Sequence, residues 1–133
     1  MLNKYNTDYG LLIIRLGIGI LFMLHGYPKI MGGPEMWVKI GGSMGNIGIN
    51  FAPAFWGFMA AFAEFVGGAC LVLGFLFRPA LAMLMFTMFI AGLMHYKSGD
   101  GFGGYNHALE SGLVFLGLFI AGPGKYALKI VRR

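Results

Sequence analysis

Charged residues are scarce in this sequence: only 11% of its residues are Asp, Glu, Lys or Arg, while 58% are hydrophobic. Soluble domains carry about 25% charged residues. A single domain of 133 residues cannot bury this much apolar side-chain surface and still present a polar exterior to water. Intrinsic disorder is excluded because it needs low hydrophobicity and high charge. The composition therefore predicts an integral membrane protein.

Cysteine is nearly absent. Cys70 is the single cysteine, which excludes an internal disulfide framework and a dithiol relay, because both need two thiols. No run of Lys or Arg is long enough to indicate nucleic-acid binding, so nucleic acid is not expected as a partner. The histidines and methionines show no ligand spacing, and we expect no metal site.

Long apolar runs are present instead. A membrane-spanning helix needs about 20 mostly apolar residues, and four segments come close: about 9–29, 54–77, 79–96 and 105–121. The first run lacks the basic start and small-residue cleavage site of a signal peptide, so we expect it to be retained. We predict an all-α fold, a four-helix bundle in the membrane, formed by one domain over residues 1–133.

The glycine-rich connection 30–53 between the first two spans has a helical pattern of its own. Pro34 and Glu35 are typical of a helix start, and apolar residues follow at helical spacing. These are Met36, Trp37, Ile40, Met44 and Ile47. We expect a short amphipathic helix in the membrane interface, with Trp37 at headgroup depth.

The distribution of basic residues predicts the orientation of the chain in the membrane. The side that holds the N-terminus carries six basic residues, Lys4, Arg78, Lys125, Lys129, Arg132 and Arg133, and the opposite side carries three, Lys29, Lys39 and Lys97. Because cytoplasmic loops are enriched in Lys and Arg, we expect a multi-pass protein of the bacterial inner membrane with both termini in the cytoplasm.

Ionisable groups inside the spans are candidates for function, because each costs about 2.5–3.5 kcal/mol on insertion scales. A rise of 1.5 Å per residue puts His25 and His95 each about 24 Å from the N-terminal side, near the level of Glu110, with Glu64 at mid-membrane. Side chains tilt toward the helix N-terminus, which favours a His25–Glu64 pair. The candidate catalytic residues are Glu64, His25 and Glu110, and the candidate pocket residues are Arg15, Phe22, Lys29, His95, Asn106 and His107.

Several of these residues have a structural interpretation beside the functional one. Arg15 either fixes topology, by snorkelling or by binding helix-end carbonyls, or serves the pocket. Lys29 is an interface anchor unless it is paired, and His107 stands at a helix start. Small residues on the Glu64 face allow close helix approach: Gly57, Ala60, Ala61 and Gly68. On the last span, Asn106, Glu110 and Gly117 align, and we expect this face to line a polar pocket in the bundle.

Three stretches of the sequence resemble the DoxX family of bacterial membrane proteins. They are RLGIGILFMLHGYPKI (15–30), AEFVGGACLVLGFLFRPALA (63–82) and GPGKYALK (122–129). The resemblance implies a four-helix inner-membrane protein, similar to the DoxD-type subunit of thiosulfate:quinone oxidoreductase, a small membrane subunit that supports electron transfer to quinone. It carries over to Arg15, His25, Gly26, Lys29, Glu64, Gly67, Gly68, Glu110 and, at a looser match, His95.

Two functions follow as hypotheses. The first is a quinone-linked oxidoreductase subunit, in which His25 or His95 donates to a quinone carbonyl and Glu64 or Glu110 relays protons. Phe22, Phe65 and Phe89 would flank the ring, and electrons would come from a membrane or periplasmic redox partner. The second is a non-catalytic accessory or scaffold protein, or one that binds lipids or small molecules, acting with a partner or as a homo-oligomer. A b-type haem between His25 and His95 is the least favoured cofactor.

Overall fold

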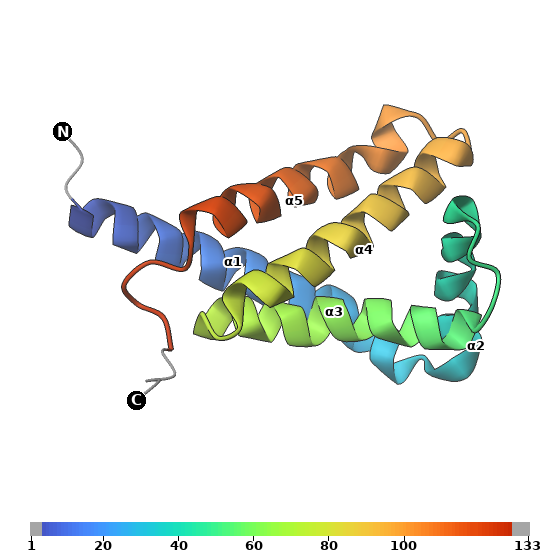
Figure 1. Ribbon diagram of the computed structural model, residues 1–133, viewed down its shortest axis with the longest axis horizontal. Helices are drawn as coiled ribbons and strands as arrows, with labels where there is room; N and C mark the ends of the chain where they lie inside the picture. Colours follow the sequence, from blue (N-terminus) through green and yellow to red (C-terminus); the bar gives the residue numbers. More distant parts are fainter. Residues whose placement is uncertain (1–3, 129–133) are drawn as a thin grey trace.

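The structure is a computed structural model that describes residues 4–128, with Lys4 described by its backbone alone. Within this range the regular structure is entirely helical, as predicted. The helices are α1 (Lys4–Met31), α2 (Gly33–Gly41), the 3₁₀ helix η1 (Gly42–Ile47), α3 (Pro53–Leu73), α4 (Phe77–Lys97) and α5 (Phe102–Ala121) (Figure 1). Lys129, Arg132 and Arg133, which contribute to the predicted orientation, lie outside the described residues.

Three of the helices in residues 4–128 are long and apolar enough to cross a membrane: Tyr5–Met31, Pro53–Leu73 and Phe77–Lys97. Helix α5 is not among them, because glycines and polar residues dilute its first half. The break before α4 lies at 74–76, a few residues earlier than the boundary between the predicted spans 54–77 and 79–96. Pro79 instead occupies the first turn of α4, where the missing N–H costs nothing.

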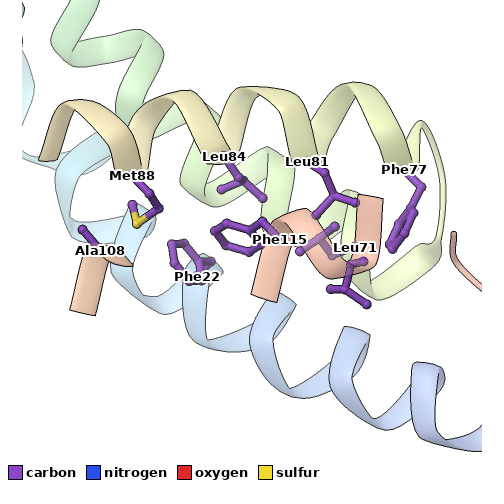
Figure 2. Packing of buried hydrophobic residues seen from close by; sticks show 9 residues of the cluster. Phe22, Leu71, Phe77, Leu81, Leu84, Met88, Ala108 and Phe115 are labelled. Atoms are coloured by element: carbon purple, nitrogen blue, oxygen red, sulfur yellow. The ribbon is translucent and has the colours of Figure 1, made fainter. Parts of the chain in front are cut away.

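The helices pack in the order α1, α3, α4, α5. Helices α4 and α5 form a hairpin that diverges from the α1–α3 pair toward the end of the molecule where α2 and η1 lie (Figure 1). Phe22 of α1 reaches across to α5, with its ring 4.9 Å from that of Phe115. The two rings lie within a buried cluster (Figure 2): Phe22, Leu71, Phe77, Leu81, Leu84, Met88, Ala108, Phe115 and Leu118.

Glycines set the close contact between α1 and α3. A Cβ added to Gly19 would lie 2.7 Å from the carbonyl oxygen of Gly68, and one added to Gly26 would lie 3.0 Å from that of Ala61. Such separations admit only glycine, because real Cβ atoms do not approach carbonyl oxygens this closely. Of the small-residue face predicted around Glu64, Ala61 and Gly68 therefore pack against α1. Gly57 packs against α2 instead, and Ala60 lines the cavity described below.

The connection 30–53 folds into α2 and η1, and α2 packs against α3. A Cβ at Gly57 would overlap the carbonyl of Trp37, and one at Gly41 would overlap the carbonyl of Pro53. The Trp37 indole donates a 2.9 Å hydrogen bond to the carbonyl of Lys29, near the end of α1 where helix carbonyls lack partners. The predicted short helix is present, and it is held by α1 and α3.

Candidate ligand-binding cavity

A cavity of about 670 Å³ lies between the α1–α3 pair and the α4–α5 hairpin, with α2 and η1 on one side. Pockets that bind small molecules typically measure about 300–1,000 Å³ and have mainly apolar walls. Here too most of the lining is apolar, and it includes Phe22, Ile40, Met59, Ala63, Phe86 and Ile90.

An ion pair forms part of the cavity wall. The Lys29 ammonium group lies 2.9 and 2.8 Å from the two carboxylate oxygens of Glu64. Glu64 is 4% exposed, whereas the Lys29 side chain is 35% exposed. The predicted His25–Glu64 pair is wrong. The Glu64 backbone touches α1 at Gly26, and because its side chain tilts toward the N-terminus of α3 it meets Lys29 nearer the end of α1.

Two histidines face each other across α1 and α5. The rings of His25 and His107 have centroids 5.5 Å apart, and both contact Phe22, with the His107 ring stacked at an interplanar angle of 13°. All three side chains line the cavity. His107 therefore belongs to the wall of the cavity, and it lies in the second turn of α5, which begins at Phe102, rather than at the helix start.

His95 lies at the α2–η1 end of the cavity. Its Nδ1 atom is 2.7 Å from a carboxylate oxygen of Asp100, just beyond α4. Next to it, η1 is attached to the same end of α4, because Ser43 donates to the sulfur of Met94 and Lys97 donates to the carbonyl of Asn46. Lys39 of α2 adds a second ammonium group to the lining.

Two features of the lining were not predicted from the sequence. Trp56 lines the cavity, and its buried indole N–H has no hydrogen-bond partner among residues 4–128. Six of the ten methionines also line it: Met36, Met44, Met59, Met83, Met88 and Met94. Methionine is flexible and polarisable, so such walls adapt to the shape of a ligand. The high methionine count of the sequence was the available signal for these residues.

Arg15 lies outside the cavity. It is 1% exposed, and its guanidinium group donates to four carbonyl oxygens at 2.7–3.0 Å. These belong to Leu71 and Val72 at the end of α3 and to Pro123 and Tyr126 beyond α5. The structure therefore supports the structural interpretation of Arg15, in which it binds helix-end carbonyls, over a role in the cavity.

Four other residues expected at the site do not line the cavity. Helix α5 packs through Ala108, Ser111, Phe115 and Leu118, so the opposite face, with Asn106 and Glu110, turns away from the core. Phe65 packs against Tyr27, and Phe89 lines a separate shallow groove between α4 and α5. Within residues 4–128, no group of three or more His, Cys, Asp or Glu is placed to hold a metal ion.

The arrangement suits an amphiphile. Aromatic and methionine side chains can surround an apolar body, while Lys29, His25 and His107 can donate hydrogen bonds to its polar end. Glu64 and the histidines can also accept protons.

Comparison with known proteins places the chain in a family. Residues 10–97 match DoxX. The chain is 33% identical over 132 residues to the inner membrane protein YqjF of Escherichia coli (strain K12), an alignment that covers 94% of this chain and 93% of that protein. No solved structure matches the chain. Two of the three regions quoted from the sequence lie within the matched range, and together with the apolar helices they show that this chain is a small, multi-pass inner-membrane protein of the DoxX family.

Proposed function

We propose that this protein binds a quinone in the cavity and acts as the quinone-binding membrane subunit of an oxidoreductase. The observation that carries the proposal is the apolar cavity of about 670 Å³ with the Lys29–Glu64 ion pair and histidines in its walls. A quinone needs an apolar space for its ring and tail, donors for its two carbonyl oxygens and a route for protons.

The lining supplies groups for each requirement. Phe22 would lie against the ring, and the methionine side chains would surround the tail. Lys29 and the His25–His107 pair would donate to the carbonyl oxygens.

Reduction of a quinone to a quinol consumes two electrons and two protons. Glu64 and the histidines would hold and pass the protons, since carboxylates and imidazoles are the usual acid–base groups. The electrons would come from a redox partner protein in the membrane or periplasm, because the sequence contains no flavin or nucleotide motif.

The proposal includes α5 as a fourth membrane span, with both termini in the cytoplasm. At 1.5 Å per residue its 20 residues extend about 30 Å, the thickness of the hydrocarbon core. It also packs against α4, which is apolar enough to span. A spanning α5 would put residues 98–101 outside and residues 122–128 inside.

The test is quinone retention by the purified protein. Protein extracted in mild detergent should carry quinone, measured by mass spectrometry of its lipid extract. Glu64→Gln and His25→Ala should lower the retained quinone about tenfold, as loss of one to two hydrogen bonds in a buried site predicts. Lys125→Gln, exposed and remote from the cavity, is the control. Quinone retention no greater than in a mock extract would contradict the proposal.

A lipid-binding role is the second candidate. The lining holds two ammonium groups, those of Lys29 and Lys39, against one carboxylate, that of Glu64, so the cavity wall is positive overall. That charge balance favours an anionic lipid headgroup. Co-purification of a phospholipid or fatty acid in place of quinone would support the lipid-binding role and contradict the quinone proposal. The bound lipid should be lost in Lys39→Met.

A further inference from the structure

The outward face of α5 repeats in a heptad pattern. Gly103, Glu110 and Gly117 are seven residues apart, and Asn106, Leu113 and Ile120 fall between and after them at alternating steps of three and four. Leu113 is 61% exposed and Ile120 is 73% exposed. Residues spaced alternately three and four apart form the contact seam between two helices that supercoil left-handedly around each other. We call these six residues the α5 seam.

Glu110 is the unexplained member of the seam. It lies about 12 Å along α5 from Phe102, which is within the hydrocarbon layer if α5 spans the membrane as proposed above. The side chain is exposed, and within residues 4–128 it has no hydrogen bond or ion pair. A carboxyl group facing lipid is costly, so such residues normally face a partner.

A second copy of the same chain offers that partner. Copies inserted in the same orientation place their α5 helices parallel, and in a two-fold pair residues at the same depth meet. The Glu110 side chain tilts toward its helix N-terminus, which brings its carboxyl group toward the level of Asn106 of the second copy. Asn106 is half-buried, and its amide also has no partner within the described chain.

The shape of the seam fits close approach. A Cβ added to Gly103 or Gly117 would meet nothing within 4 Å among the described residues, so both glycines leave room for another helix. Helices in lipid associate through such small residues together with hydrogen bonds between polar side chains. The exposed face of α1 that carries Ile13 and Leu24 also has open glycines, Gly10 and Gly17, but its polar members, Asn6 and Tyr27, lie near the two ends of α1 and neither is a carboxyl group.

We propose that the protein forms a parallel homodimer along the α5 seam, held by two reciprocal hydrogen bonds between Asn106 of one copy and Glu110 of the other. This proposal rests on the membrane span proposed for α5. It does not depend on the ligand of the cavity.

Disulfide crosslinking in native membranes tests the proposal. In a Cys70→Ala background, Leu113→Cys and Gly117→Cys should each give a crosslinked dimer of this chain on mild oxidation. Ile13→Cys and Leu24→Cys, exposed on α1, are matched controls and should stay monomeric. Equal crosslinking at the α1 and α5 positions, or none at the α5 positions, would overturn the proposal. A crosslink to a protein of another size would assign the seam to a different partner.

Variants of Glu110 test the hydrogen bonds. With Leu113→Cys as reporter, Glu110→Gln keeps an acceptor and should retain the dimer, whereas Glu110→Leu should lower its yield at least about fivefold. Equal yields in the two variants would exclude the reciprocal bonds. Labelling of Ser98→Cys and Lys125→Cys from the two sides of the membrane tests the span separately. Quinone retention reports on the cavity alone, so failure of either proposal is distinguishable.

Discussion

At the residue scale, Arg15 joins α1 to two segments that are distant in the sequence, the end of α3 and the chain beyond α5. Its planar guanidinium group reaches carbonyls at the end of α3 and in residues 123–126 together. Arg15→Ala removes the donors and leaves the carbonyls without them, so it should lower the free energy of unfolding by about 2–4 kcal/mol. Thermal or SDS-induced unfolding in detergent measures this loss.

Arg15→Lys and Arg78→Ala complete that experiment. Lysine keeps the charge but has a compact head that cannot reproduce the planar fork, so Arg15→Lys should recover only part of the stability. Arg78 is exposed and donates one hydrogen bond, to the carbonyl of Phe119. Its replacement by alanine should cost about 1 kcal/mol or less. Equal losses for Arg15→Ala and Arg78→Ala would contradict a special role for the Arg15 contacts.

The Lys29–Glu64 pair separates structural from functional effects. Lys29→Met alone leaves the buried Glu64 carboxylate uncompensated and should destabilise the protein by about 1–3 kcal/mol. The double variant Lys29→Met/Glu64→Leu should be more stable than that single variant, because no charge is left unpaired. Both should lose bound quinone. A double variant that recovers stability and retains quinone would show that the pair serves folding alone.

The sequence predicted one member of the buried ion pair, Glu64, but not its partner. Glu64 was singled out from the sequence because a carboxyl group at mid-membrane is rare, and the structure places it in the cavity wall. Its partner was missed because the choice between His25 and Lys29 depends on how far α1 and α3 slide past each other. That offset is set by the Gly19–Gly68 and Gly26–Ala61 contacts, which do not follow from depth estimates on separate helices.

At the element scale, α2 closes one side of the cavity and is held by glycine contacts with α3. Gly57→Ala would push its methyl group into the Trp37 carbonyl and should displace α2, lowering stability by about 2–3 kcal/mol and reducing quinone retention. Limited proteolysis of the 30–53 connection and quinone content measure the two effects.

Gly17→Ala is the matched control for that change. An added Cβ at Gly17 meets nothing within 4 Å, and alanine has the higher helix propensity, so stability should stay level or rise by up to about 1 kcal/mol. If Gly57→Ala behaved like Gly17→Ala, the close packing of α2 on α3 would be refuted.

The positions of the helices were predictable, whereas their rotations were not. Each apolar run falls on one helix, because a continuous stretch of apolar residues determines which part of the chain can lie in lipid. In a membrane helix the lipid-facing and core-facing sides are both apolar, so periodicity gives little information on rotation. The Asn106–Glu110 face of α5 was therefore expected toward the pocket, whereas α5 packs through the face that carries Phe115.

At the scale of the whole molecule, two antiparallel pairs diverge around the cavity. The α1–α3 pair is closed by glycine contacts, and the α4–α5 hairpin shares the apolar cluster with it through Phe22 and Phe115 (Figure 2). At the other end, residues of α2 and η1 line the cavity between the two pairs. The cavity thus exists because the two pairs meet at one end and are held apart at the other.

This arrangement predicts which loops face each side of the membrane. In a Cys70→Ala background, a membrane-impermeant maleimide should label Ser98→Cys from the periplasmic side of spheroplasts. It should label Lys125→Cys only in inverted vesicles, because a spanning α5 separates the two positions and the basic residues favour a cytoplasmic C-terminal segment. Labelling of both from one side would show that α5 does not cross. Exchange of the two patterns would show that α5 crosses in the opposite orientation, with the cavity's α2–η1 end toward the cytoplasm.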